Sequence, residues 1–130
     1  MNSVQQKYYL AYYMPEGYGF QDVIRSIKLA KKLGGFVSIN YLVMPGFSDY
    51  RKEVESLLRF LERTKVDMVQ WRNLNYDPMV YFRTLKLKQN RSDMIGIKEL
   101  IRKVKKERPD LMQGYFNPSK RRMQKAKKKR

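Results

Sequence analysis

The sequence of 130 residues contains neither cysteine nor histidine. Without cysteine, the chain offers no disulfide, no thiolate nucleophile and no thiolate ligand for zinc or for an iron–sulfur cluster. Without histidine, it offers no Ser-His-Asp triad, no histidine general base and no histidine metal ligand. Hydrolytic or metal chemistry on this chain would therefore depend on its 12 aspartate and glutamate side chains.

Long apolar runs are also absent. No run approaches the roughly 20 residues that a membrane-spanning helix needs. The best candidate, residues 36–47, is interrupted by Ser38, Asn40 and Pro45. The first residues lack a basic stretch followed by an apolar one, so we expect no signal peptide. The sequence therefore predicts a cytoplasmic protein without a membrane partner.

Acidic residues are few, since 29 lysines and arginines against 12 acidic residues give a net charge of +17. The imbalance is greatest in residues 119–130, SKRRMQKAKKKR, which contain eight basic residues and no acidic one. Because this segment has almost no apolar side chain to bury, we expect a disordered basic tail. The remaining residues, 1–118, have the length of one domain, and 42% hydrophobic residues in the chain suffice for a packed core.

Helical and strand periodicities alternate along residues 1–118. The pattern predicts helices over residues 4–14, 20–33, 48–64, 78–87 and 94–107, and strands over residues 36–43, 66–72 and 111–116. We expect Ser48 or Asp49 to cap the third helix, and Pro78 to open the fourth. The apolar face of the third helix is predicted to consist of Val54, Leu57, Leu58 and Leu61. Strands separated by such helices predict right-handed βαβ crossovers, and therefore an α/β fold with a parallel sheet.

Two features of this pattern are unusual for a complete parallel sheet. Three strands are few, and the chain begins with two predicted helices that no strand precedes. An unpaired edge at residues 36–43 would also favour pairing with another chain. We therefore expect residues 1–118 to be part of a larger barrel or doubly wound sheet.

The segments that follow the predicted strands are rich in Asn, Asp, Gly and Pro, and they are residues 44–49, 73–77 and 117–118. Parallel α/β folds bind ligands beyond the carboxyl ends of their strands, so these segments are candidates for a binding rim. The same residue types also form ordinary turns, and the composition fits both interpretations.

The predicted strands are more polar than a buried parallel sheet requires. Ser38 and Asn40 share one face of the first strand, and Gln70 and Arg72 share one face of the second. A fully buried parallel strand is usually apolar on both faces, so this pattern predicts a polar lumen. A buried arginine is costly without a partner. Arg72 is therefore expected to meet an anionic partner, to reach solvent at the strand end, or to pair with Asp77.

The order of these motifs resembles the C-terminal part of radical S-adenosylmethionine (radical SAM) proteins. The run SINYLVMPGFSD (Ser38–Asp49) is similar to the fifth barrel strand of that family and its following turn. After an amphipathic helix, VDMVQWRNLNYDP (Val66–Pro78) resembles the sixth strand. Met1–Ser3 resembles the end of a fourth strand, and GYFNP (Gly114–Pro118) a closing segment. The resemblance implies that residues 1–118 form a partial (β/α) barrel, the C-terminal half of a TIM-like barrel.

In this family, a CxxxCxxC motif after the first strand holds a four-iron cluster. S-adenosylmethionine binds the fourth iron, and its reductive cleavage gives a 5′-deoxyadenosyl radical. This chain contains no cysteine, and no segment of it matches the first three strands. The resemblance therefore implies a C-terminal fragment that contributes the S-adenosylmethionine and substrate-side wall and is not catalytic alone. Its implied partner is a missing N-terminal half-barrel, or a second copy joined through the exposed sheet edge.

The resemblance also implies which residues bind the cofactor at the fourth and fifth strands. Asn2 and Ser3 match the fourth-strand end, where the family contacts the ribose and the methionine part of the cofactor. Asn40 matches an inward-facing polar position of the fifth strand that reaches the cofactor. Pro45 and Gly46 match the turn that lies beside the adenine.

Three further positions match the sixth strand. Gln70, Arg72 and Asn73 lie along it, near the adenine and the substrate side in the family. The substrate is normally set by other parts of the barrel, so the resemblance implies no particular reaction.

Two other functions fit the composition. A basic protein with 13% aromatic residues attracts polyphosphates in a salt-dependent manner. A nucleic-acid interface would then use the basic side chains of the tail, which are Lys120, Arg121, Arg122, Lys125, Lys127, Lys128, Lys129 and Arg130. The same tail is also consistent with a solvated segment that aids solubility, which is the more common role of such a charge run. Alternatively, the tyrosine cluster at residues 8–13 forms a partner surface in a purely structural domain, or packs in the core.

Overall fold

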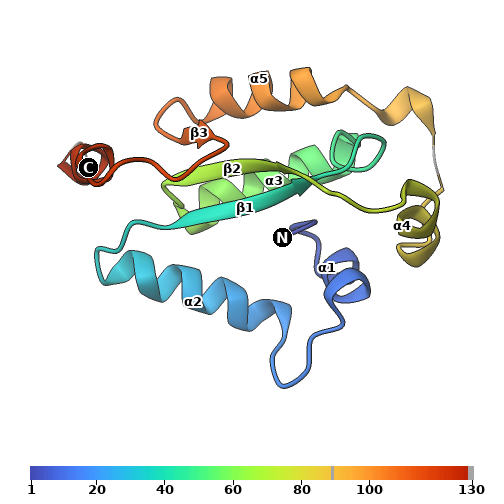
Figure 1. The fold of residues 1–130 in the computed structure, drawn as a ribbon, viewed down its shortest axis with the longest axis horizontal. Coiled ribbons are helices and arrows are strands. Elements are labelled where there is room, and N and C mark those ends of the chain that lie inside the picture. Colours follow the sequence, from blue (N-terminus) through green and yellow to red (C-terminus); the bar gives the residue numbers. More distant parts are fainter. Residues whose placement is uncertain (89, 129–130) are drawn as a thin grey trace.

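The computed structural model describes residues 1–88 and 90–128 (Figure 1). Its helices are α1 (Gln6–Tyr13), α2 (Phe20–Lys32), α3 (Arg51–Thr64), α4 (Pro78–Thr84), α5 (Ile97–Glu107) and α6 (Lys120–Lys128), with a short 3₁₀ turn at Arg91–Asp93. Its strands are β1 (Ser38–Val43), β2 (Met68–Asn73) and β3 (Met112–Gly114). The order of helices and strands up to β3 agrees with the order that the sequence predicts.

The three strands form one parallel sheet in the order β1-β2-β3. Asn40 lies opposite Gln70, and Leu42 lies opposite Arg72. Because side chains alternate along a strand, these residues share one face of the sheet. The predicted α/β fold with a parallel sheet is therefore confirmed.

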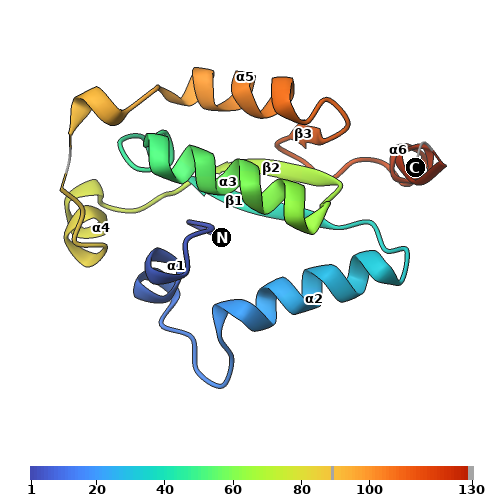
Figure 2. The ribbon, with the colours of Figure 1, turned by 180° about the vertical axis from the view of Figure 1, so that it is seen from behind.

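The helices that connect the strands pack on a single face of this sheet. In Figure 1 the front of β1 and β2 carries no helix and α3 lies behind them, while Figure 2 shows α3 in front. α3 contacts α2 on one side and α5 on the other. The main core lies between these helices and the sheet, and it includes Ile24, Ile27, Ile39, Tyr41, Leu57, Leu61, Val69, Leu100 and Val104. The opposite face is called the open face below, and its strand residues are Ser38, Asn40, Leu42, Met68, Gln70 and Arg72.

The first residue of the chain pairs with the outer edge of β1. The Met1 amine donates to the carbonyl of Asn40, and the Leu42 N–H donates to the carbonyl of Met1 at 2.8 Å. These two bonds flank Tyr41 in the pattern that neighbouring parallel strands adopt. Within residues 1–88 and 90–128, no other backbone bond joins this edge.

A second apolar cluster lies at the carboxyl ends of β1 and β2. It joins α1, α4 and the loop after β1 through Met44, Phe47, Tyr81 and Leu85, with Tyr8 and Tyr12 packed against them. Tyr9 is buried in the main core, whereas Tyr13 is 37% exposed. Most of the tyrosine cluster therefore packs inside the described structure.

The loop after β1 differs from the sequence prediction. Helix α3 begins at Arg51, and neither Ser48 nor Asp49 caps it. The Ser48 hydroxyl instead accepts from the Met44 N–H at 2.9 Å, and the Asp49 carboxylate accepts from the Gly46 N–H at 2.7 Å. Gly46 has φ +89°, a conformation that glycine adopts without strain, and it folds the loop back onto these two side chains. The predicted capping role was therefore wrong.

Residues 120–128 form helix α6, where their composition predicted a disordered tail. The Ser119 carbonyl accepts from the N–H of Arg122 and so begins the helix. This segment has no apolar face, but its lysine, arginine, glutamine and alanine residues all favour helix, which explains why it adopts this form.

In the part of the chain that the structure describes, no helix has the length and apolar character needed to cross a membrane.

Candidate functional site

Gln70 lies at the centre of a hydrogen-bonded row on the open face. Its side chain is almost fully buried, and its Nε2 donates to Ser38 Oγ at 3.0 Å and to Asn117 Oδ1. Its Oε1 accepts from Arg72 Nη2 at 3.1 Å. Both ends of the amide therefore have partners, and these partners hold Gln70 in one orientation.

Arg72 is held by stacking and by this amide rather than by a carboxylate. Its guanidinium carbon lies 4.6 Å from the centre of the Tyr115 ring and 5.9 Å from that of Phe116. Among the described residues, no carboxylate forms an ion pair with it. The predicted alternative, pairing with Asp77, was wrong because Asp77 caps α4 by accepting from the N–H groups of Met79 and Val80.

The surroundings of Arg72 suit a planar or anionic ligand. Tyr115 is 50% exposed and Phe116 is 74% exposed, although aromatic rings of this size are usually buried more fully. Asn40 is exposed on the same face of the neighbouring strand β1, and Asn73 is exposed at the end of β2. A guanidinium with free donors beside exposed rings and amides can bind an anion bidentately and stack a flat ring system.

Asn2 and Ser3 lie in the interior, away from this row. Neither side chain is accessible to solvent. Asn2 Nδ2 donates to the Tyr8 carbonyl at 3.2 Å and to the Tyr81 hydroxyl at 3.1 Å, while its Oδ1 has no hydrogen-bond partner. Ser3 Oγ donates to the Glu53 carboxylate at 2.8 Å. A ligand would have to displace these internal bonds to reach either residue.

Glu53 is an interior residue that the sequence reasoning missed. Its carboxylate is 1% exposed and accepts four hydrogen bonds. The donors are Ser3 Oγ at 2.8 Å, the Val4 N–H at 3.1 Å, Gln5 Nε2 at 2.7 Å and the Tyr41 hydroxyl at 2.7 Å. Burial and the negative charge of Glu53 hold the pKa of Tyr41 well above its usual range. Glu53 thereby joins residues 3–5 to the sheet.

The predicted site residues thus fall into three places. Asn40, Gln70 and Arg72 come together on the open face, with Asn73 exposed at the end of β2. Asn2 and Ser3 are internal. Pro45 and Gly46 form the turn after β1, and Pro45 is exposed.

The open face offers groups for binding but no evident catalytic group. The described residues contain no cluster of three or more acidic, cysteine or histidine side chains that could hold a metal ion. Gln70, Asn40 and Arg72 are poor general bases, because amides do not ionise and a guanidinium stays protonated. The arrangement is therefore suited to recognising a ligand.

On α6, Lys120, Arg121, Arg122, Lys125 and Lys128 are exposed. Lys127 lies within the helix, while Lys129 and Arg130 lie outside the described residues.

Comparison with known proteins adds no relative, since no family model, no curated protein and no solved structure matches this chain.

Proposed function

We propose that residues 1–118 form the C-terminal wall of a (β/α) barrel of the radical SAM type, whose open face lines the ligand-binding lumen. The observation that carries this proposal is that α2, α3 and α5 all pack on one face of the parallel sheet. In a doubly wound sheet helices cover both faces, whereas in a barrel they form an outer ring. The one-sided arrangement therefore favours the barrel.

The polar residues of the open face support the same proposal. Gln70 is buried and hydrogen-bonded to Ser38 and Asn117, although no helix of the described residues covers it. A polar row of this kind is expected in a lumen that receives a ligand and is unusual in a sheet face that packs against a helix. Asn40 and Arg72 are the open-face residues that this proposal assigns to the ligand, while the buried Gln70 holds the Arg72 guanidinium in place.

The proposal requires further strands beside β1. Met1 already bonds to Asn40 and Leu42 in the manner of a parallel neighbour. A preceding N-terminal half-barrel, or a second copy of the chain, would continue the sheet at this edge. The cytoplasm is the compartment in which we place this assembly.

The cofactors of the family fit this chain only in part. The sequence has no cysteine, so this chain supplies no thiolate ligand for a four-iron cluster. S-adenosylmethionine carries a carboxylate and an adenosine, and the Arg72 guanidinium and the exposed amide of Asn40 are groups that bind such a molecule. We therefore assign to this chain the binding of one side of the ligand, and no bond-breaking step.

Complementation tests the proposal. The 130-residue chain is mixed with the N-terminal half of a radical SAM barrel that carries the CxxxCxxC segment, and complex formation and S-adenosylmethionine affinity are measured. We expect a complex whose affinity falls about tenfold on Arg72→Ala. Arg25→Ala, which alters an exposed arginine of α2, should leave the affinity unchanged. A chain that stays monomeric and binds neither this half nor a second copy would contradict the proposal.

Helix α6 favours a second candidate, which is binding to nucleic acid. It places exposed basic side chains on one short helix without an acidic residue, and such a helix neutralises phosphates in a sequence-independent manner. The test is RNA and DNA affinity of the whole chain and of residues 1–118. Loss of binding with the tail assigns it to residues 119–130, whereas binding that persists in residues 1–118 assigns it to the folded domain. If neither the whole chain nor residues 1–118 binds RNA or DNA at physiological salt, the proposal of nucleic-acid binding fails and the tail is a solvated segment.

A further inference from the structure

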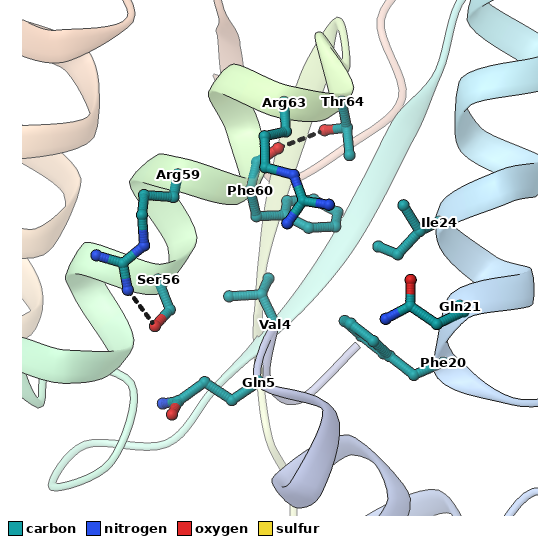
Figure 3. Close-up of a pocket in the computed structure, with 10 residues that line it drawn as sticks. All are labelled: Val4, Gln5, Phe20, Gln21, Ile24, Ser56, Arg59, Phe60, Arg63 and Thr64. Carbon is teal, nitrogen blue, oxygen red and sulfur yellow. Dashed lines mark hydrogen bonds between the residues drawn. The ribbon is translucent and has the colours of Figure 1, made fainter.

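A cavity of about 210 Å³ lies between α2 and α3, on the helical side of the molecule and away from the open face (Figure 3). Its apolar lining comes from three separate segments of the chain. Four side chains provide it, each nearly buried, and they are Val4, Phe20, Ile24 and Phe60. None of the residues assigned to the ligand of the open face contributes to this cavity.

The rim of the cavity is positively charged. Arg59 and Arg63 line the cavity from α3, where they lie one turn apart. Gln5, just before α1, and Gln21, on α2, also line it. Arg59 Nη2 donates to Ser56 Oγ at 3.2 Å. In the described part of the chain, Arg63 makes no ion pair, and Figure 3 shows its side chain extending toward the space between the helices.

Among the described residues, no aspartate or glutamate forms an ion pair with either arginine, and Glu55, one helical turn before Arg59 on α3, does not line the cavity. No aspartate or glutamate lines the cavity. On α3, Glu62 pairs with Lys65, and the Glu53 carboxylate accepts four hydrogen bonds in the interior. On α2, Asp22 pairs with Arg25. Two like charges one helical turn apart repel each other, so an anion from outside the chain would relieve the repulsion.

We infer that this cavity binds a small carboxylate that carries one aromatic ring. An apolar cavity of about 150 Å³ accepts a benzene molecule, so the present volume holds a ring and leaves room for a short acidic arm. The ring contacts Phe20, Ile24 and Phe60. The carboxylate lies at the rim beside the planar guanidinium group of Arg63, while Arg59, which is turned toward Ser56 in Figure 3, adds positive charge one helical turn away. The charge and the apolar lining together distinguish this ligand from an inorganic anion.

Titration of the full chain with 3-phenylpropionate tests this inference, with 3-phenylpropanamide as the uncharged analogue of the same shape. The measurement is the methyl spectrum of Val4 and Ile24, which report from inside the cavity. We expect these signals to shift and to saturate with the carboxylate. The Arg59→Gln/Arg63→Gln double variant should weaken the affinity about tenfold. Arg51→Gln, at an exposed arginine of the same helix outside the cavity, should leave it unchanged.

Three outcomes would overturn the inference. The first is the absence of a saturable shift at Val4 and Ile24. The second is an amide that binds as tightly as the carboxylate, since the arginines would then contribute nothing. The third is a loss of affinity in Arg51→Gln as large as in the double variant, because the effect would then come from the general positive charge of the chain.

Discussion

The Tyr41 hydroxyl donates a 2.7 Å hydrogen bond to Glu53 Oε1 between β1 and α3. Tyr41 is fully buried and Glu53 is 1% exposed. The same carboxylate also accepts from residues 3–5. One buried negative charge thus connects the first residues, the sheet and the helical layer, and the donors around it offset the cost of its burial.

Glu53→Gln should therefore destabilise the fold. The amide nitrogen of glutamine would face a hydrogen-bond donor, so at least one of the four bonds is lost, and the remaining bonds no longer involve a charge. We expect the free energy of unfolding to fall by about 2 kcal/mol, measured by urea denaturation. Glu55→Gln, at an exposed glutamate of the same helix, should change it by less than about 0.5 kcal/mol. Equal effects of the two substitutions would show that the Glu53 contacts do not stabilise the fold.

The Tyr41–Glu53 pair also predicts how stability depends on alkaline pH. The pKa of Tyr41 is raised in the folded state, first by burial and then by the charge of Glu53. The folded state therefore favours the neutral phenol, and this contribution is present below the tyrosine pKa of the unfolded chain, about 10. It is lost as the pH rises above that value, because the unfolded chain ionises first.

Tyr41→Phe separates this effect from that of the other tyrosines. The variant should be less stable than the parent by about 1 kcal/mol at pH 8, since the hydrogen bond is lost. The difference should shrink between pH 10 and 11.5, measured by urea denaturation at each pH. A constant difference over this range would mean that the unfolded chain gains nothing from ionising Tyr41.

Local patterns were sufficient to predict the strands and their faces. Side chains alternate along a strand, so the shared face of Gln70 and Arg72 follows once β2 is recognised. The register that places Ser38 and Asn40 on that same face depends on how β1 and β2 align. The polar row could therefore be anticipated strand by strand, although its hydrogen bonds to Asn117 could not.

Glu53, the loop after β1 and α6 could not be predicted in this way. The burial of Glu53 depends on donors that are distant in the sequence, and hydrophobic periodicity counts a glutamate as solvent-facing. Its position four residues before Leu57 was the available signal, because that spacing places both on one helix face. Ser48 and Asp49 have the composition of helix caps, but the turn at Gly46 gives them other partners. For residues 119–130, composition predicted a disordered tail because the segment has almost no apolar side chain to bury, and it did not predict the helix α6 that the structure has there.

Arg72→Ala should affect ligand binding more than stability. The guanidinium stacks on exposed rings and has no carboxylate partner among the described residues, so its removal should cost less than about 1 kcal/mol in the free energy of unfolding. In a complete barrel of the radical SAM type, the type that we propose for this chain, the equivalent change should weaken S-adenosylmethionine or substrate binding about tenfold. Calorimetric titration and urea denaturation compare the two effects. Unchanged affinity in a stable variant would remove Arg72 from the site.

Deletion of residues 119–130 should leave the folded domain intact. In the described structure α6 makes no extensive contact with another element, so the free energy of unfolding should change by less than about 0.5 kcal/mol. Affinity for nucleic acid should fall, and the remaining binding should depend less steeply on salt because fewer phosphates are neutralised. A full-length variant with glutamine at the basic positions of the tail is the matched control for chain length. If it binds as tightly as the parent, positive charge on the tail is not the source of affinity, and the second candidate function fails.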